Sequence, residues 1–475
     1  MASAAHIDEE AAPGGQPSLK RVMGPGLLLL FIVGDVLGTG IYALTGTVAA
    51  EVGGVVWLPF LIAFLVALIT AFSYLELVTK YPQAAGAALY THKAFGIHFL
   101  TFLVAFAVMS SGITSASTAA RAFSANAAAV FDLDVGEGIG ITLIGLGFMT
   151  LVALVNFRGV GESVKANVVL TCVELTGLLI IIGIGVWALG IGEGDFSRIT
   201  EFDTGDKSVL TGVIAATGLA FFAMVGFEDS VNMAEECKEP RRIFPKVLLL
   251  GLGITGLIYV LVSISAIALV PADQLSEGET PLLQVVEAGA PAFPLGLFGV
   301  ITMFAVANTA LINMLMASRL VYGLGREGVL PPFLSRVHPT RRTPVTAILF
   351  TTALAFGLIT FVGAVPDLGG TTALLLLMVF AVVNVAVLVL RRKPIDEHHF
   401  RTPTILPIIG AIACAYLATP FAGRPVVQYK IAGILLAIGV VLWGVTVLVN
   451  RRAGRGPVEL DPTALSGDHP SGPRN

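Results

Sequence analysis

Apolar residues along this chain gather in twelve long runs, which are separated by short polar segments. Each run is roughly 18 to 28 residues long, enough for a helix to cross the ~30 Å hydrocarbon core of a bilayer. The pattern therefore predicts an all-α integral membrane protein with twelve transmembrane helices. The expected spans are 25–51, 54–79, 98–124, 139–157, 164–190, 209–236, 245–270, 293–323, 344–363, 370–390, 404–422 and 428–449.

Two of these spans are interrupted by residues that a lipid-spanning helix has no reason to carry. The first contains a Gly-Thr-Gly sequence within 33–41, and the sixth contains a glycine and two adjacent acids within 223–229. Irregular backbone inside a bilayer is tolerated only where protein shields it or where it lines a watery cavity. Matched interruptions in two halves of a chain indicate a transporter's substrate site. A single Gly-x-Gly can also mark a close contact between helices.

The composition agrees with a membrane protein. Hydrophobic residues make up 55% of the 475 residues and charged residues only 13%, whereas soluble domains carry about 25% charged residues. There is no basic patch with interleaved aromatic residues, which excludes nucleic acid as a partner. The three cysteines are far apart and lack the spacing of metal ligands, so we predict neither a metal site nor a cofactor.

The distribution of lysine and arginine predicts the orientation in the cell membrane. If both termini are cytoplasmic, all but five of the 28 basic residues fall on the cytoplasmic side, as the positive-inside rule requires. The polar segments 1–19 and 453–475 are expected to be disordered cytoplasmic tails, and residues 20–450 to form the transporter domain. The five exceptions are Arg121, Arg198, Lys207, Arg424 and Lys430.

The order of the spans indicates an internal repeat. Spans one to five cover about 25–190, spans six to ten cover about 209–390, and each set opens with an interrupted helix. An odd number of spans per unit places the second unit upside down relative to the first. Such inverted repeats form a binding site near the middle of the membrane. The last two spans, about 404–449, lie outside the repeat.

The interrupted first span offers hydrogen-bond donors. A break in a helix leaves backbone groups without partners. The second half of the span should therefore present free N–H groups at the positive end of its dipole, where a carboxylate binds well. These groups belong to Gly38, Thr39, Gly40 and Ile41.

Both interrupted spans also offer acceptors, because the halves that precede the breaks should end in free carbonyl groups. Carbonyl groups suit an ammonium group, so one small cavity would bind both charged groups of an α-amino acid. The expected carbonyl groups belong to Val33 and Gly34 in the first span and to Phe222, Ala223 and Val225 in the sixth.

Five acidic residues fall inside the predicted spans, where an ionisable group indicates function if it faces a cavity. Asp35, Glu174 and Glu228 are interpreted as candidates for binding the coupling proton. Asp35 could instead bind the ammonium group or a cationic side chain of the substrate, or pair with another span. Glu76 is interpreted as a structural partner of a basic loop residue, and Asp229 as the cap of the second half of span six.

Four motifs, in order along the chain, resemble those of the amino acid–polyamine–organocation (APC) permeases. They are Gly-Thr-Gly-Ile-Tyr at 38–42, Tyr-Leu-Glu-Leu with Tyr-Pro at 74–82, Phe-Ala-Met-Val-Gly-Phe-Glu at 222–228 with the basic segment after it, and the segment 318–344 after span eight. The resemblance covers about residues 20–450. The segment after span six is similar to bacterial permeases and to the cationic amino acid transporter branch.

This resemblance implies the sodium–leucine-transporter fold, alternating access and, often, proton coupling. It implies that the Gly-Thr-Gly sequence binds the substrate carboxylate and that Phe222 is an aromatic gate over the substrate. Asn313 would line the pocket for the substrate's side chain, and Glu228 matches an acidic position beside the unwound part of span six. Many proton-coupled relatives have a lysine where span five here has Glu174, so the coupling ion stays open.

The sequence thus favours a secondary transporter of amino acids, with a proton as the coupling ion, over two other classes. A membrane enzyme would need a nucleophile and a base, or a metal, at the membrane face, and no such motif occurs. A channel would need a selectivity filter, usually built by oligomeric symmetry. Because there is no P-loop, a gradient or an exchange must drive transport. An amino acid/polyamine exchanger is the alternative, and the substrate and the oligomeric state stay open.

Overall fold

In the computed structural model, residues 23–83, 86–133, 136–158, 163–341, 343–393 and 398–452 are described, and nearly all of them are helical. The fold is the all-α membrane architecture that the sequence predicts. The expected tails, 1–19 and 453–475, lie outside the described residues.

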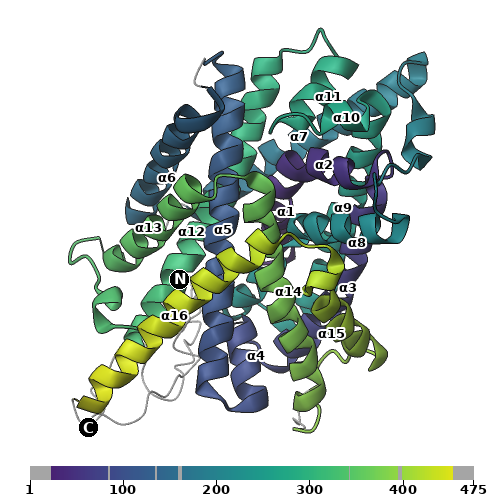
Figure 1. Ribbon diagram of the computed structural model, residues 1–475. Helices are drawn as coiled ribbons and strands as arrows, with labels where there is room; N and C mark the ends of the chain where they lie inside the picture. The colour runs from purple at the N-terminus through teal and green to yellow at the C-terminus, as the bar shows by residue number, and fades with distance from the viewer. Residues whose placement is uncertain are drawn as a thin grey trace, which may run out of the picture.

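The helices follow the order of the twelve expected spans (Figure 1). In the described part of the chain, ten segments are long and apolar enough to cross a membrane, and two shorter apolar helices stand at the ninth and eleventh positions. The spans are α1 (Pro25–Val36) with α2 (Thr39–Val52), α3 (Trp57–Lys80), α5 (His98–Val130), α6 (Ile141–Arg158), α7 (Ser163–Ile191), α8 (Val209–Ala220) with the 3-10 segments η3 (Phe221–Met224) and η4 (Asp229–Glu236), α9 (Pro240–Leu269), α12 (Leu295–Arg326), α13 (Val345–Phe361), α14 (Val365–Leu390), α15 (Ile405–Leu417) and α16 (Val426–Arg452).

Short helices that the sequence did not predict join these spans. In α4, Gly86 has a φ of +39°, and a Cβ atom there would lie 2.8 Å from Asn232 Oδ1, so the helix begins directly against η4. Gly86 therefore has a packing role. The short elements are η1 (Gly136–Gly140), η2 (Phe196–Thr200), η5 (Pro332–Ser335), η6 (Pro420–Ala422), α4 (Gly86–Phe95), α10 (Ala272–Leu275) and α11 (Pro281–Gly289).

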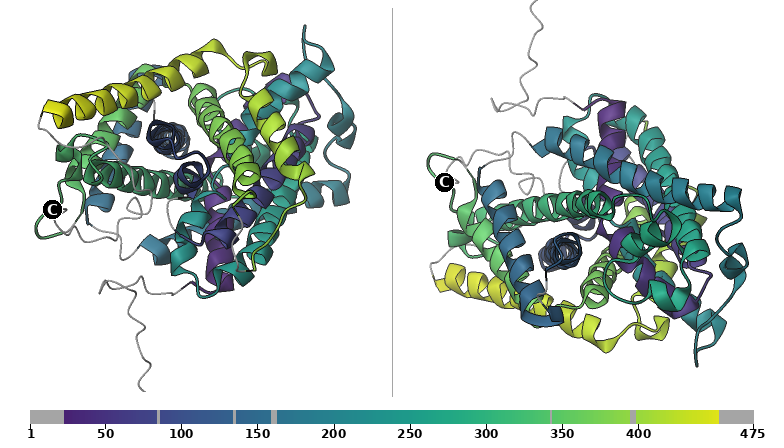
Figure 2. Two further views of the ribbon diagram at one scale, coloured as in Figure 1. Left: turned by 90° about the horizontal axis from the view of Figure 1, so that it is seen from below. Right: turned by 90° about the horizontal axis from the view of Figure 1, so that it is seen from above.

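Burial separates the inner helices from those at the edge of the bundle. In the most apolar window of the first span 83% of the residues are buried, against 28% in α16 and 22% in α6. Figure 2 shows α16, in yellow, along the edge of the bundle. The interrupted helices are thus shielded by protein, as irregular backbone in a bilayer requires.

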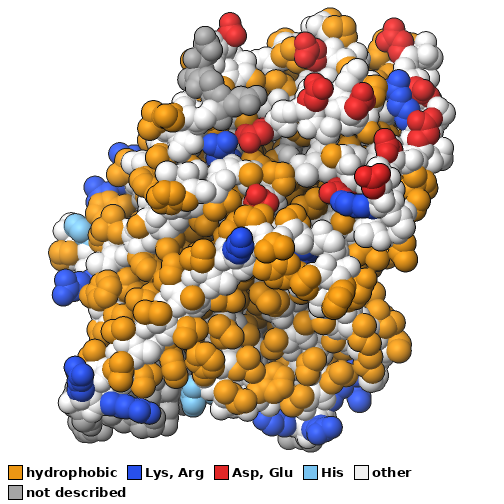
Figure 3. Space-filling model, viewed as in Figure 1, with side chains coloured by type: hydrophobic (Ala, Val, Ile, Leu, Met, Phe, Trp, Pro, Cys, Tyr) orange, Lys and Arg blue, Asp and Glu red, His pale blue; other side chains and the backbone are white. Residues whose placement is uncertain are grey.

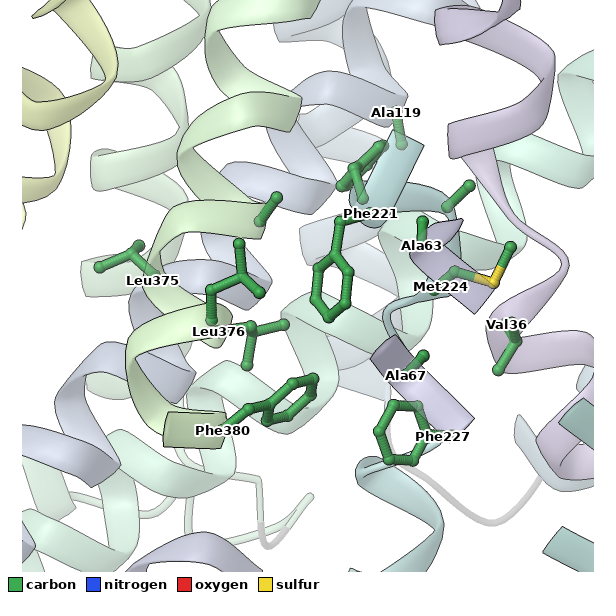
Figure 4. Packing of buried hydrophobic residues seen from close by; sticks show 14 of the residues in the cluster. Val36, Ala63, Ala67, Ala119, Phe221, Met224, Phe227, Leu375, Leu376 and Phe380 are labelled. Carbon is green, nitrogen blue, oxygen red and sulfur yellow. The ribbon is translucent and has the colours of Figure 1, made fainter. Parts of the chain in front are cut away.

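Aromatic residues pack where span six meets α14. The Phe380 ring of α14 lies 6.0 Å from the ring of Phe221 and 5.3 Å from that of Phe227. Met224 and Val36 lie close to the same cluster (Figure 4). Since these side chains flank the two breaks, apolar packing holds the irregular segments in place from one side.

Charged side chains lie mainly at the two ends of the bundle, with a hydrophobic band between them (Figure 3). The acidic end holds the segment 195–206, where Gly54 N donates to Glu201 O (2.9 Å). The basic end holds the start of α1, where Lys238 N donates to Met23 O (3.2 Å).

A buried ion pair joins three spans at the basic end. Arg391 Nε and Nη2 donate to Glu76 Oε1 and Oε2 at 2.8 and 2.6 Å, and Thr402 N donates to Glu76 Oε2 at 2.9 Å. The hydrogen bonds to Glu76 raise the pKa of the Arg391 guanidinium group. Glu76, on α3, therefore has the structural role that the sequence predicted, tying α3 to the end of α14 and to the segment before α15.

A second buried guanidinium group links helices near the other end. Arg424, before α16, donates to the carbonyl oxygens of Leu417, Gly218 and Gly370 at 2.6, 3.1 and 3.0 Å. Leu417 and Gly218 lie in the last turns of α15 and α8, whose carbonyl groups lack partners within the helix. Arg424 thus connects the helices outside the repeat to spans six and ten.

Arg121 of α5 is mostly buried. It lies 3.6 Å from the Glu279 carboxylate, in the connection between α10 and α11. The segment before α12 is thereby attached to α5.

Candidate functional site

The two breaks meet at a small cavity inside the bundle. In this conformation the cavity has room for about one water molecule. An amino acid therefore fits only after the surrounding segments separate. The cavity is lined by Asp35, Val36, Gly38, Thr39, Gly40, Ser115, Phe222, Val225, Gly226, Asp229, Thr309 and Asn313.

The break in the first span falls at two extended residues, Leu37 and Gly38. Thr39 and Gly40 then belong to the first turn of α2, whose N–H groups have no acceptor within the helix. Thr39 N donates to Thr309 Oγ1 of α12 at 3.3 Å. The hydroxyl group of Tyr259 in α9 donates to Val36 O, at the end of α1. Side chains of two other spans thus stabilise the open backbone.

The break in the sixth span falls at Val225–Glu228. Val225 is extended, and Gly226 has a φ of +126°, a conformation that favours glycine. A Cβ atom on Gly226 would lie 2.5 Å from Asp35 O, so the two breaks touch here. Below the break the chain continues as η4, a 3-10 segment rather than the expected α-helix.

The interrupted spans also touch at Gly40. A Cβ atom on Gly40 would lie 2.5 Å from Ala223 Cα and 2.9 Å from Ala223 N. Only glycine lets α2 approach the backbone of η3 this closely. The Gly-Thr-Gly sequence therefore lies at a helix break and also allows close packing at Gly40, while its role in binding the substrate stays a prediction.

Four carboxyl groups gather around the cavity. Asp35, Glu174 and Glu228 are buried, and Asp229 is half-buried. Glu228 Oε2 accepts from Gly226 N at 2.9 Å, so this side chain folds back onto the break. Asp35 Oδ2 and both carboxyl oxygens of Glu174 have no hydrogen-bond partner. Among the described residues, no lysine or arginine forms an ion pair with these four groups.

Seven of the predicted site residues line the cavity. They are Asp35, Gly38, Thr39, Gly40, Phe222, Val225 and Asn313.

The other predicted residues lie nearby but do not line it. Val33 O accepts from Leu37 N (2.8 Å) because α1 continues to Val36, so this carbonyl group is not free. Gly34 packs against Thr171 of α7. The remaining predicted residues are buried but do not line the cavity: Ile41, Ala223, Glu174 and Glu228.

The structure adds lining residues that the sequence did not indicate. Ser115 of α5 and Thr309 of α12 carry hydroxyl groups, which in membrane helices commonly bond to their own backbone and so give no signal. Asp229, interpreted as a cap, lines the cavity and accepts weakly from Asn232 Nδ2 at 3.4 Å. Val36 and Gly226 complete the lining because the breaks turn their backbone toward it.

Phe222 lies between the cavity and α14. A Cβ atom on Gly369 of α14 would lie 3.3 Å from the Phe222 ring and 3.1 Å from Leu44 Cδ1. The absence of a side chain at Gly369 thus leaves the space that the ring occupies. No group of three or more His, Cys, Asp or Glu side chains that could hold a metal ion occurs among the described residues.

Comparison with known proteins places the chain in a family. A family model described as amino acid permease matches residues 27–445. The chain is 26% identical to the branched-chain amino acid permease of Bacillus subtilis (strain 168) over 456 residues, covering 91% of this chain and 94% of that protein. It is 28% identical to the methylthioribose transporter of the same organism over 440 residues, 88% of this chain and 92% of that protein.

The chain is also similar to a plant protein. Cationic amino acid transporter 9, chloroplastic, of Arabidopsis thaliana is 31% identical over 342 residues, covering 68% of this chain and 58% of that protein. The family match includes both interrupted spans and every residue that lines the cavity. The chain belongs to the amino acid permease family, within the APC superfamily, and is a transporter rather than an enzyme.

Proposed function

We propose that this chain is a secondary active transporter that carries amino acids across the cell membrane by alternating access, with protons as the coupling ion. The observation that carries the proposal is the cavity between the two interrupted spans. It is lined by the first turn of α2 and by the acidic residues Asp35 and Asp229.

This arrangement matches the two charged groups of an amino acid. The N–H groups of Thr39 and Gly40 lie at the positive end of the α2 dipole and would bind the carboxylate, which would replace Thr309 Oγ1 as the acceptor of the Thr39 N–H group. Asp35 and Asp229 would bind the ammonium group through charge-assisted hydrogen bonds. Asn313 would contact the substrate's side chain.

Phe222 would act as the gate, because its ring lies between the cavity and α14. The small volume of the cavity supports alternating access. Since an amino acid does not fit in this conformation, binding and release require the segments around the breaks to move.

Proton coupling rests on the buried carboxyl groups. Asp35, Glu174 and Glu228 lie close to the breaks and form no ion pair with a described basic residue. An ionised carboxylate without a partner is costly in such surroundings, so these groups are suited to binding a proton. Uptake would then combine a proton and a substrate in one cycle.

The proposed domain organisation has one transporter domain, 20–450, with repeats at about 25–190 and 209–390. The two interrupted helices at corresponding positions support it. We place both termini in the cytoplasm because basic side chains gather at the end of the bundle where α1 begins (Figure 3).

An amino acid/polyamine exchanger is the second candidate. Two acidic side chains line the cavity, and the described residues of its lining include no lysine or arginine, which favours a substrate with additional positive charge. The relatives are named for different substrates, so the family alone does not decide the substrate.

Uptake by the purified chain in liposomes tests both candidates. One labelled amino acid is competed with every amino acid and with polyamines, at two pH values and with either an inward proton gradient or internal unlabelled substrate. Symport predicts accumulation driven by the proton gradient without internal substrate. Exchange predicts uptake only with internal substrate. The absence of amino acid uptake under both conditions would reject the proposed function.

A further inference from the structure

The Thr309 hydroxyl group lies where the substrate carboxylate is expected to bind. It reaches from α12 to the first turn of α2 and accepts a hydrogen bond from Thr39 N at 3.3 Å. Thr309 and Thr39 both line the cavity between the two breaks. The N–H group that the proposed function assigns to the substrate therefore already has an acceptor, which the protein itself supplies.

Gly38 makes this contact possible. A Cβ atom on Gly38 would lie 2.8 Å from Thr309 Oγ1 and 3.7 Å from Thr309 Cγ2. The backbone of Gly38 is extended, with a φ of −139°, so the need for glycine here comes from space and not from conformation. A side chain at this residue would push the Thr309 hydroxyl group away from the start of α2.

The closed conformation around the breaks has no room for an amino acid. The two interrupted spans touch at Gly40 and at Gly226, and the cavity between them has room for about one water molecule. Thr39 is buried there. A buried N–H group without an acceptor makes a conformation less favourable by a factor of about 5 to 150. The Thr309 hydroxyl group removes this cost when no substrate is bound.

The same contact is weak enough for a substrate to displace. A backbone N–H group has a single hydrogen, so a full-strength bond goes to one acceptor at a time. The 3.3 Å distance is long for an N–H···O bond, which usually measures about 2.7–3.2 Å. A carboxylate binds an N–H group about twice as strongly as a neutral acceptor does. The released Thr309 hydroxyl group can donate to Ala305 O, one turn earlier on α12, as threonines in membrane helices commonly do.

We propose that Thr309 is a positioning residue that takes the place of the substrate carboxylate, so that the carrier can close and return without substrate. The proposal rests on the proposed function, which assigns the carboxylate to the first turn of α2, and it adds a consequence for the mode of transport. A carrier that returns empty supports net uptake, as symport requires. An obligatory exchanger returns only when it is loaded.

Transport by the full chain in liposomes tests this role through the ratio of two rates. Net uptake into vesicles without internal substrate requires the empty carrier to return, whereas exchange with internal unlabelled amino acid does not. Thr309→Val keeps the shape of the side chain but removes the hydroxyl acceptor. The ratio of net uptake to exchange should therefore fall by about 5- to 150-fold. Thr309→Ser, which keeps the hydroxyl group, should keep the wild-type ratio.

Thr302→Val is the matched control. Thr302 is buried on α12 two turns before Thr309, and its hydroxyl group donates to Phe298 O of its own helix at 3.2 Å. Its loss should leave the ratio of net uptake to exchange unchanged. If Thr309→Val does not fold, as thermal unfolding would show, Thr309→Ala also removes the acceptor and should lower the ratio.

A second measurement needs no transport. Ser115→Cys places a thiol in the buried lining of the cavity, in a chain whose exposed Cys172 has been replaced through Cys172→Ser. Without amino acid, a membrane-permeant thiol reagent should label this thiol slowly, because the closed conformation buries it. Adding Thr309→Val should raise the labelling rate by about 5- to 150-fold, and adding Thr302→Val should not.

The outcomes separate this role of Thr309 from the proposed function. If the wild-type chain exchanges amino acids but shows no net uptake, the empty carrier does not return, and the role is overturned while amino acid transport stands. An equal fall of both rates in Thr309→Val, or labelling at the wild-type rate, also overturns it. If no uptake of any kind is found, the proposed function is rejected, and the labelling rate still decides whether Thr309 holds the cavity closed.

Discussion

The contact between Gly40 and Ala223 gives the sharpest prediction. In Gly40→Ala the new Cβ atom would lie 2.5 Å from Ala223 Cα, whereas carbon atoms prefer separations of about 3.5–4.0 Å. The first turn of α2 and the η3 backbone must therefore move apart by about 1 Å. Overpacking of this kind costs about 1–3 kcal/mol, which corresponds to roughly a 5- to 150-fold loss in an equilibrium constant.

The loss should appear in transport more than in folding. The displaced N–H groups line the proposed carboxylate site, so we expect kcat/KM for uptake into liposomes to fall within this range. Gly253→Ala in α9 is the matched control, because a Cβ atom there meets nothing within 4 Å. Ala223→Gly should not rescue Gly40→Ala, because the clashing Cα and N atoms of Ala223 remain.

Uptake by Gly40→Ala at the wild-type rate and KM would refute this reasoning, since it would mean that the close approach of the two spans has no part in transport. Recovery of Gly40→Ala by Ala223→Gly would also contradict it, by placing the clash at the Ala223 side chain. Thermal unfolding of each variant distinguishes a local displacement from a loss of the fold.

Three further predictions concern other parts of the structure. Glu76→Gln leaves the mostly buried charge of Arg391 without its counter-ion, which costs about 3–5 kcal/mol, so the melting temperature should fall clearly. Glu239→Gln removes an exposed ion pair and should leave the melting temperature unchanged. Asp35→Asn should raise the KM of a substrate with an ammonium group by about 10- to 150-fold, the effect of losing a hydrogen bond to a charged group. An equal KM in the wild type and in Asp35→Asn would show that Asp35 does not bind the substrate. Phe222→Ala should raise KM about tenfold or more, the change that about 1.4 kcal/mol brings, and unchanged binding in a radioligand assay would show that the ring does not cover the substrate.

The sequence predicted the order of the spans and the position of both breaks, because long apolar runs and a Gly-Thr-Gly sequence inside one of them carry strong local signals. It could not predict that α1 continues to Val36, since the end of that helix depends on a hydrogen bond from Tyr259, more than 200 residues away. For the same reason Thr309 was missed. Its contact with Thr39 is purely tertiary, and nothing distinguishes it in sequence from other threonines in apolar helices.

The sequence also could not predict the conformation of the second half of span six, Asp229–Glu236. The sequence indicated a second half-helix capped by Asp229, but the chain forms a 3-10 segment there, and Asp229 lines the cavity. Gly86 and Asn232 lie in direct contact, so the shape of η4 follows from packing against α4. Propensity within η4 itself could not reveal this.

The hydrogen bonds of Arg424 limit how span six can move. The guanidinium group of Arg424 holds α8, α14 and the end of α15 together. A displacement of α8 alone would therefore leave this buried cation without its hydrogen bond to Gly218 O. The upper part of span six should therefore travel with the last helices as one rigid body. Bending is then left to the short stretch around Gly226, whose missing side chain makes it the natural pivot of the molecule.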